Sequence, residues 1–417
     1  MSKPFEKKTY FCLTLDPIYV GTGGYRLGRV DNTIIREPGT NLPKIPGSSI
    51  AGVTRSYTAM AIQSEANAYD INYPLDDEGD KKVLNKEKYK KMKYLRPKYK
   101  LLNLKEGYIE LDKDGNPKIE EDKDGKEIYL SCAGKGGEDG EGHCGEPDCP
   151  ICIAFGFSKG KSNISFQGLA QFYDARILFF PVNSMIGPVW ITSPSVLEFA
   201  KVSTDTIKPE NWNELINSEL SKVESGITKE YFYTQCSQIR DFLNLGWLYL
   251  PKTSVTEIDD IKIPPVTQWK IIEGTSSSDK ELSEVGINNA ILNRIIIVSD
   301  RLFSRIVNDN LEVRTSVAID PATGTAEEGA LFSYEAIPRA TVMWFDIVYN
   351  KPEYFRIKVQ EDKRWQEKEI QHGESPGEGW KWVKDNVEKG LQYLEYLGVG
   401  GMATKGMGRL KILNLGG

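Results

Sequence analysis

Histidine is scarce in this 417-residue sequence, which contains only His143 and His372. A mechanism that needs a pair of histidines would therefore have to use both of them. Long hydrophobic runs are also missing, since no apolar stretch approaches the roughly 20 residues of a membrane helix. The first residues, MSKPFEKKTYF, lack the apolar segment of a secretory signal. These absences predict a cytoplasmic protein with reduced thiols and no membrane partner.

A positive net charge is missing as well, because 53 basic residues face 59 acidic ones and leave a net charge of −6. This balance argues against a protein that coats nucleic acid through charge alone. The charge is unevenly distributed, however. Residues 1–60 have a local charge of +4, residues 396–417 of +3 and residues 201–300 of −5. RNA contacts in the first and last segments therefore stay possible.

The hydrophobic patterns predict strands and helices in mixed order, which is typical of an α+β fold. Ser48 and Ser49 follow a Pro-Gly turn and are candidate N-caps of a helix. The predicted elements are strands at 9–15, 165–182 and 410–413, helices at 49–65 and 383–394, and a long hairpin at 311–338. Residues 66–164 and 201–300 resemble insertions, the second of mixed helix and loop.

A cysteine-rich segment in the first insertion has the composition of a metal site. Five candidate ligands lie within 21 residues: Cys132, His143, Cys144, Cys149 and Cys152. Thiolates and imidazole are the ligands of tetrahedral Zn²⁺, and the glycines around them cannot build a core that would order the segment. We predict a structural zinc ion on Cys144, Cys149 and Cys152, with His143 or Cys132 as the fourth ligand.

Two glycine-rich segments offer backbone N–H groups next to cations. Residues 21–28 contain Arg26, and residues 398–408 contain Gly400, Gly401, Lys405 and Gly406, with Arg409 directly after them. Successive unhindered N–H groups can form a nest that binds phosphate. Each segment alone is weak evidence, because glycine-rich turns are commonly just turns.

Several motifs together resemble the RAMP superfamily of CRISPR proteins. The segment 45–55, IPGSSIAGVTR, is similar to the signature that begins a helix in that superfamily, and 398–408 is similar to its glycine-rich loop. Residues 172–182, 190–194 and 310–314 resemble the repeated backbone subunit of Cmr-type (type III-B) RNA-guided effector complexes. The cysteine cluster is closer to the backbone subunit of Csm-type complexes, so the subtype stays open.

This resemblance implies a single RAMP-type domain over residues 1–417, with a ferredoxin-like, RRM-related sheet and a protruding β-hairpin thumb at 301–340. It implies that several copies stack in a filament on a guide RNA, together with other type III subunits and a single-stranded target RNA. The implied RNA contacts are Arg26, Lys44, Ser48, Ser49, Arg55, Gly400, Gly401, Lys405, Gly406 and Arg409.

The resemblance also implies cleavage of the target RNA at regular intervals, with Asp31 as the catalytic residue. Asp31 would bind Mg²⁺ or Mn²⁺, or help to deprotonate the attacking 2′-OH. One alternative is a catalytically inert scaffold in which Asp31 only caps a turn. Another is a guide-processing endonuclease, which commonly needs histidine and is disfavoured because neither histidine lies near the RNA motifs.

Overall fold

The computed structural model describes residues 3–23, 30–68, 75–78, 81–84, 104–105, 108–109, 131–134, 143, 145–161, 163–224, 226–253, 257–258, 261–272, 279–325, 331–361 and 364–416. The chain divides into two compact units, each built from separate segments. The first unit contains residues 1–6, 51–171 and 348–393, and the second contains residues 7–50, 172–347 and 394–417.

A mixed sheet is the centre of the fold. Its strands follow the order β15-β22-β11-β10-β25-β1-β28, while β2 pairs with β10 and β9 pairs with β25 beside this path. Their bounds are β1 (Phe5–Thr14), β2 (Lys44–Ile45), β9 (Ala170–Phe172), β10 (Ala175–Ser184), β11 (Gly187–Thr192), β15 (Phe232–Tyr233), β22 (Ile295–Val298), β25 (Val342–Asn350) and β28 (Leu410–Ile412). The pairs β10–β11 and β1–β28 are antiparallel, and β11–β22 is parallel.

Hydrophobic runs explain which strands are central. All four residues of β22, IIIV, are buried, and four consecutive residues of β10, Ile177–Phe180, are buried as well. Such continuous runs are expected where both faces of a strand are covered. Helices α4 (Pro194–Phe199) and α7 (Asp300–Asp309) pack beside the sheet. Ser299 caps α7, because its side chain accepts a hydrogen bond from the Leu302 N–H.

Many short elements of the second unit lie between β11 and β22. They are β12 (Val202–Ser203), α5 (Trp212–Leu220), β13 (Ser221–Glu224), β14 (Ile227–Glu230), β16 (Phe242–Leu245), β17 (Leu248–Pro251), β18 (Glu257–Ile258), β19 (Ile261–Lys262), β20 (Lys270–Ile271), β21 (Lys280–Glu281) and α6 (Asn289–Leu292). Most of these strands form two-stranded hairpins. We expected a mixture of helices and loops in residues 201–300. The structure has many short strands there as well.

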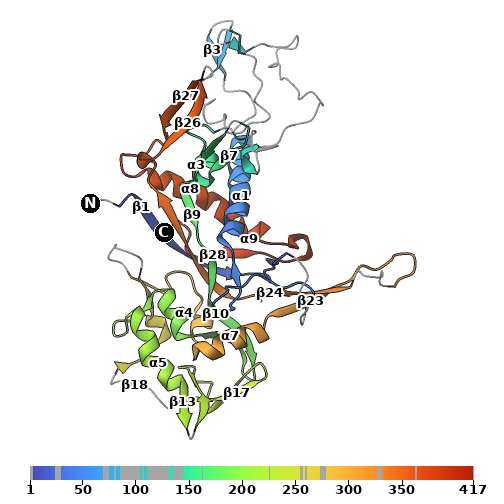
Figure 1. The fold of residues 1–417 in the computed structure, drawn as a ribbon, viewed down its shortest axis with the longest axis vertical. Coiled ribbons are helices and arrows are strands. Elements are labelled where there is room, and N and C mark those ends of the chain that lie inside the picture. Colours follow the sequence, from blue (N-terminus) through green and yellow to red (C-terminus); the bar gives the residue numbers. More distant parts are fainter. Residues whose placement is uncertain are drawn as a thin grey trace. The chain divides into compact units, whose positions relative to one another are not determined.

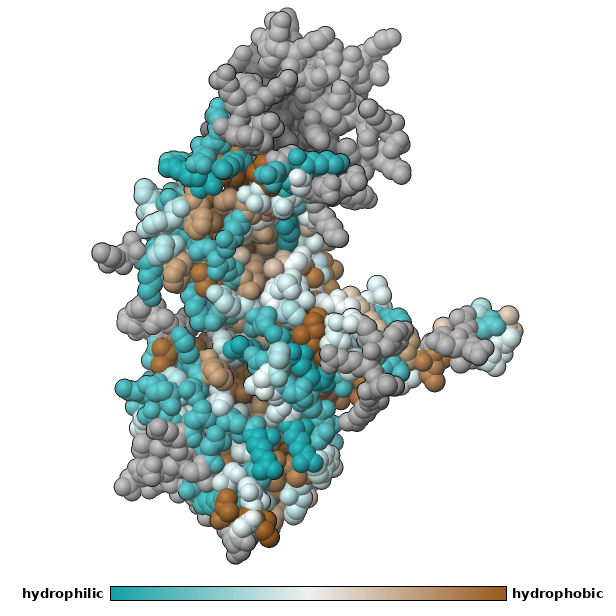
Figure 2. All heavy atoms as spheres, viewed as in Figure 1, coloured by the Kyte–Doolittle hydropathy of each residue, from teal (hydrophilic) through white to brown (hydrophobic). Residues whose placement is uncertain are grey.

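One hairpin projects from its unit, as Figure 1 shows. It consists of β23 (Glu312–Ser316) and β24 (Phe332–Ala336), which pair antiparallel with Thr315 opposite Ser333. Val317, Ile319 and Leu331, next to its paired strands, are exposed apolar side chains. Figure 2 shows brown, hydrophobic atoms along the projecting part. These residues lie where the sequence predicts a long hairpin.

The first unit contains α1 (Gly47–Ala68) from residue 51 onward and α8 (Gly379–Gln392). Its other elements are β3 (Leu75–Glu78), β4 (Lys81–Leu84), β5 (Leu104–Lys105), β6 (Tyr108–Ile109), η2 (Ser131–Ala133), α3 (Pro150–Phe155), β7 (Phe157–Lys159), β8 (Ile164–Phe166), β26 (Arg356–Glu361) and β27 (Arg364–Glu369). Among the described helices, none is long and apolar enough to cross a membrane.

Helices α1 and α8 approach closely at Gly390, which gives a test of their packing. A Cβ atom at Gly390 would lie 2.4 Å from both the Thr54 carbonyl oxygen and the Thr58 Oγ1. We therefore expect Gly390→Ala to destabilise the protein by about 1–3 kcal/mol, the usual cost of overpacking. Gly52→Ala is the matched control, because nothing lies within 4 Å of its added Cβ. Thermal unfolding of both variants measures the difference; equal melting temperatures would contradict this packing.

Two predicted helices differ from the observed ones. Helix α1 begins at Gly47 rather than residue 49, so Ser48 and Ser49 lie inside its first turn and are not caps. The late helix ends at Gln392, and a separate short helix, α9 (Leu394–Leu397), follows Tyr393. In both cases the helical period predicted the element, and local contacts set its ends.

Candidate functional site

Asp31 lies at the root of the projecting hairpin. Its carboxylate oxygen Oδ2 accepts hydrogen bonds from the backbone N–H of Ser333, at 2.7 Å, and from the Ser333 hydroxyl, at 2.9 Å. The Asp31 N–H in turn donates to Ser333 Oγ over 3.2 Å. The neighbouring residue Asn32 forms a bridge with Tyr334 of β24. Asp31 is thus exposed but fixed to the hairpin, although 302 residues separate it from Ser333.

These hydrogen bonds further favour the ionised form of Asp31. Donation from the Ser333 N–H and hydroxyl lowers the pKa of the Asp31 carboxyl below its usual value of 3.8. The side chain is therefore a carboxylate at neutral pH. A lowered pKa makes a carboxyl a weaker general base, because efficient proton acceptors have a pKa near the working pH. Of the two roles expected for Asp31, the geometry favours an anion that attracts a cation.

The glycine-rich segment packs against the same hairpin. The Gly401 N–H donates to the Tyr19 carbonyl at 2.8 Å, and a Cβ on Gly400 would lie 2.3 Å from that oxygen, so Gly400, with φ of 88°, admits only glycine. A cluster of Tyr334, Ala336 and Met407 anchors the hairpin, with Tyr19, Phe332 and Met402 around it. The loop and the hairpin root therefore form one packed structure.

The predicted cations of this segment lie in different surroundings. Lys405 is exposed, with its Nζ 3.3 Å from Ser316 Oγ and 5.9 Å from the centre of the Phe332 ring. Because successive side chains of a strand face opposite sides, Phe332 faces Lys405 while Ser333 faces Asp31. Arg409 forms an ion pair with Asp16, with Nη2 3.1 Å from Oδ1. Lys405 is thus the better candidate for a phosphate contact.

The N-terminus of α1 is already occupied by a carboxylate of the same chain. Asp174 accepts hydrogen bonds from the Gly47 N–H at 2.8 Å and from Lys44 Nζ at 2.6 Å. Burial favours a raised pKa of Asp174, but these donors outweigh it and the pKa is lowered. The phosphate expected at Lys44, Ser48 and Ser49 would share this helix end with Asp174.

The contribution of this Asp174 cap to stability should depend on pH. Replacing Asp174 by Asn should cost about 1 kcal/mol at neutral pH, as loss of a helix cap commonly does. Because the pKa of Asp174 is lowered in the folded state, its contribution is complete above about pH 4, the usual Asp value, and is lost as the pH falls through the folded pKa. Denaturant unfolding measures the difference in the free energy of unfolding between wild type and Asp174→Asn. This difference should be smaller at pH 3 than at pH 7. An equal difference in unfolding free energy at both pH values would contradict an ionised cap.

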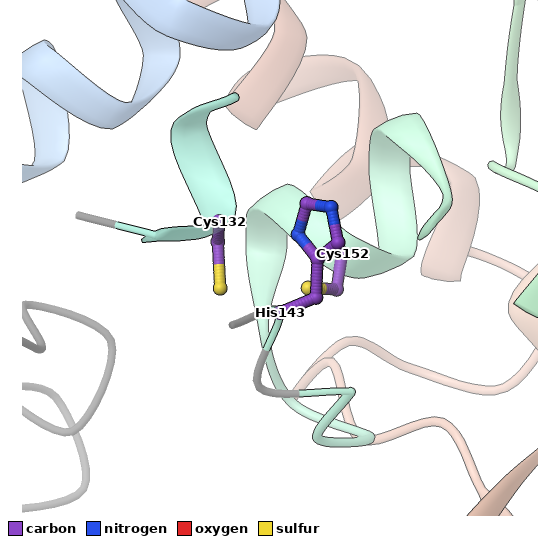
Figure 3. A group of neighbouring side chains, drawn as sticks. All are labelled: Cys132, His143 and Cys152. Carbon is purple, nitrogen blue, oxygen red and sulfur yellow. The ribbon is translucent and has the colours of Figure 1, made fainter. Parts of the chain in front are cut away.

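A cluster of metal-ligating side chains lies in the first unit. Ligand atoms of Cys132, His143 and Cys152 lie within 4.8 Å of one another, and all three residues are buried. Figure 3 shows the three side chains near one another, from η2, the segment at 143 and α3. Two sulfurs on one tetrahedral zinc, each 2.3 Å from the ion, would be roughly 3.8 Å apart. A small contraction would therefore let this group hold a metal ion.

The observed group differs from the preferred ligand set. Cys132 and His143 are brought together rather than being alternatives, while Cys144 lies outside the described residues. Cys149 is the N-cap of α3, with its sulfur accepting the Cys152 N–H at 3.4 Å. Such an N–H bond would also stabilise a thiolate at Cys149.

Arg55 lies beside this cluster. Its Nε donates to the Cys132 carbonyl at 2.8 Å, and its Nη2 is 3.2 Å from His143 Nδ1. Arg55 was expected to contact RNA at the start of α1. The Arg55 guanidinium thus lies next to the metal-ligating cluster, and its expected RNA contact stays a prediction.

One candidate cannot be placed, and two residues with a role in the site were not predicted from the sequence. Arg26 lies outside the described residues, so its expected RNA contact stays a prediction. Ser333 and Asp174 were not singled out, although each holds a candidate site residue or helix end. Ser333 belongs to none of the motifs above, and Asp174 lies in the segment 172–182 without an assigned role. Each has its partner more than 100 residues away. Only the fold identifies them.

Comparison with known proteins places most of the chain in one family. The family model described as the RAMP superfamily matches residues 11–411. Over 186 residues, the chain is 29% identical to the CRISPR system Cmr endoribonuclease Cmr4 of Pyrococcus furiosus. That alignment covers 42% of this chain and 54% of the relative, so the match spans about half the length of the relative.

Solved structures with weaker similarity were also found. The Type III-B Cmr-beta cryo-EM structure of the apo state matches with a TM-score of 0.45 and 15% identity, covering 100% of this chain and 99% of the other. The crystal structure of oligomeric Cmr4 from Pyrococcus furiosus matches with a TM-score of 0.41 and 16% identity, covering 99% and 100%.

Proposed function

The chain belongs to the RAMP superfamily, and from that membership we propose that it is the repeated backbone subunit of a Cmr-type, type III-B CRISPR effector complex. Its core is then the ferredoxin-like, RRM-related sheet of that family in a single RAMP-type domain. Its partners are a guide RNA, a complementary single-stranded target RNA, further copies of itself and other type III subunits. The sequence similarity to a Cmr endoribonuclease supports this function.

One observation carries the proposal: the β23–β24 hairpin contacts two other segments that the sequence analysis linked to RNA, the Asp31 segment and the glycine-rich loop. Asp31 bonds to Ser333, Lys405 lies over Phe332, and the glycine-rich loop packs around Tyr334. A hairpin thumb that displaces a target nucleotide would do so beside a fixed carboxylate and an exposed cation. A displaced nucleotide can adopt the in-line geometry that a stacked helix forbids, and positioning of this kind can supply much of the acceleration.

Cleavage at that point would follow from attack of the 2′-oxygen on the adjacent phosphorus. The 2′-OH gives its proton to solvent water, the P–O5′ bond breaks, and the leaving 5′-oxygen takes up a proton from water. The products end in a cyclic 2′,3′-phosphate and a 5′-OH. Asp31 stays ionised and supplies negative charge at a fixed place. Lys405 and the glycine-rich loop hold the RNA backbone.

The side chains at Asp31 fit a Mg²⁺ or Mn²⁺ ion only in part. Among the described residues, Asp31 belongs to no group of three metal-ligating side chains, so it offers a single carboxylate. Mg²⁺ is commonly held by one or two carboxylates together with substrate phosphates and water. Asp31 would be the protein ligand, and the ion would supply charge stabilisation at the phosphate when bound.

The inert scaffold is the second candidate, and the Ser333 hydrogen bonds favour it. A carboxylate that accepts an N–H and a hydroxyl across two segments already has a structural role. In this case the thumb and the glycine-rich loop would still bind RNA, while Asp31 would only fix the hairpin root.

We further propose that the Cys132–His143–Cys152 group holds a structural Zn²⁺, with Cys144 or Cys149 completing the tetrahedron. The burial of the three residues, their thiol and imidazole chemistry and their proximity support this assignment. All ligands would be protein side chains, which is typical of a closed, structural site.

The proposed function predicts bound RNA. When the chain is co-expressed with a CRISPR array and the other type III subunits and then purified, we expect it to carry RNA of uniform length. Extraction and denaturing electrophoresis of that RNA provide the measurement. Protein assembled with those subunits but free of RNA would contradict both the backbone role and the scaffold role.

A further inference from the structure

Three exposed aromatic side chains lie on the β16–β17 hairpin of the second unit, two on its strands and one in its turn. Phe242, Trp247 and Tyr249 are 50%, 63% and 59% exposed. We call these three residues the aromatic platform. Large aromatic groups left this open on a surface are commonly binding sites.

The rings of the platform are held in place. Phe242 and Tyr249 stack with their centroids 5.2 Å apart and an interplanar angle of 6°. The Trp247 Nε1 donates to Asp309 at 3.1 Å, and the Arg305 guanidinium lies 5.0 Å from the Trp247 ring centre. Each ring thus has a partner on one side, and its exposed area is pre-organised for a flat ligand.

The platform lies next to Asn310, where the chain enters the projecting hairpin. A Cβ on Gly246, which precedes Trp247, would lie 2.7 Å from Asn310 Oδ1, so the turn packs on the end of α7. Asn310 leads directly into β23. Five residues later, Thr315 pairs with Ser333, the partner of Asp31. At the usual rise of a strand, this separation is roughly 16 Å.

The local charge differs from that of the surrounding insertion. Residues 201–300 have ten basic and fifteen acidic residues, a net charge of −5. The hairpin, its flanking residues and the partners of Trp247 contain three basic and two acidic residues: Arg240, Lys252, Arg305, Asp241 and Asp309. This set therefore has a net charge of +1 although the insertion as a whole is acidic, and a local positive excess favours contact with phosphate.

We propose that the aromatic platform stacks unpaired bases of single-stranded RNA that passes the root of the β23–β24 hairpin, with Arg305 beside the RNA backbone. Base–aromatic stacking tolerates any sequence, because every base has a flat face. This inference rests on the proposed function, since that function brings RNA to the hairpin root. It extends the RNA path into the 201–300 insertion.

The test uses complexes assembled with the full chain and a labelled complementary target RNA. Trp247→Ala and Tyr249→Ala should each weaken target binding on the order of tenfold, within the range of one lost base stack. Trp247→Phe should keep most of the affinity, whereas Trp247→Leu, which is apolar but not flat, should behave like Trp247→Ala. Ile227→Ala, at an apolar residue 66% exposed on the β13–β14 hairpin, is the matched control. At saturating RNA, cleavage in all variants should match wild type.

Unchanged affinity in the alanine variants, with RNA bound normally by wild type, would overturn the platform while leaving the proposed function intact. Loss of a protein subunit from the Trp247→Ala complex, with affinity retained in Trp247→Leu, would also overturn it and identify a protein-docking surface. A wild-type complex that binds no RNA would overturn the proposed function itself.

Discussion

Replacing Asp31 by Asn is expected to slow target-RNA cleavage by at least 100-fold in the assembled complex while leaving target affinity within twofold. Asn keeps the shape of the side chain and an oxygen that can accept the Ser333 N–H, so the hairpin root should stay in place. Only the negative charge is lost, and electrostatic contributions to a transition state are commonly worth 100- to 1,000-fold. Single-turnover cleavage at saturating protein measures the effect.

Asp320→Asn is the matched control. Asp320 is also exposed, lies in the loop between β23 and β24, and has its pKa lowered by hydrogen bonds from the Ala322 N–H and the Thr323 hydroxyl. Its neutral variant should cleave like wild type. If Asp31→Asn also cleaves like wild type at every site in a normally assembled complex, the chain is a scaffold and Asp31 is structural.

The pH profile separates two roles for Asp31. Because the pKa of Asp31 is lowered, a carboxylate that acts by its charge should lose activity only below about pH 4, the usual Asp value. A general base tuned for catalysis would give an inflection between pH 5 and pH 8. An inflection there that disappears in Asp31→Asn would contradict the charge role.

Removing the metal cluster is expected to have the largest effect on stability. Cys152→Ala should reduce bound zinc from about one equivalent to near zero and lower stability by about 4 kcal/mol, as loss of a structural metal can. For a domain of 150–250 residues this is a fall in melting temperature of roughly 8–16 °C. Metal analysis and thermal unfolding of the same preparations provide the measurements.

Cys236→Ala is the control for this change, because Cys236 is also buried and has a free thiol but lies outside the cluster. It should retain zinc. Wild-type protein with less than half an equivalent of zinc and intact cysteines would contradict the metal site.

Elements with strong local patterns were predictable from sequence, and their partners were not. The hairpin at 311–338, the last strand and the helix after Pro46 follow from alternation, periodicity and turn residues. The true cap of that helix is Asp174, whose position 127 residues away no helix-start rule can supply. Similarly, the hydrophobic period predicts one helix over 383–394, whereas the structure has two helices with Tyr393 between them.

The candidate site shows the same limit. Asp31 was identified through family resemblance, but its low pKa depends on Ser333, a residue without a motif of its own. Arg55 matched an RNA-binding signature, yet its guanidinium contacts Cys132 and His143. Side-chain chemistry could be read from the sequence, whereas the neighbours that set each side chain's charge and accessibility come from the fold.

The pairing of β1 with β28 also has a consequence for biosynthesis. Cys12 lies opposite Ile412, so the partner strand is made 400 residues later, roughly 20–80 s at ordinary ribosome speeds. During that time one edge of β1 has no β28, and exposed strand edges invite pairing with other chains. We therefore expect this strand to be the part of the nascent chain that depends most on chaperones, and faster completion of the chain to increase the yield of folded protein.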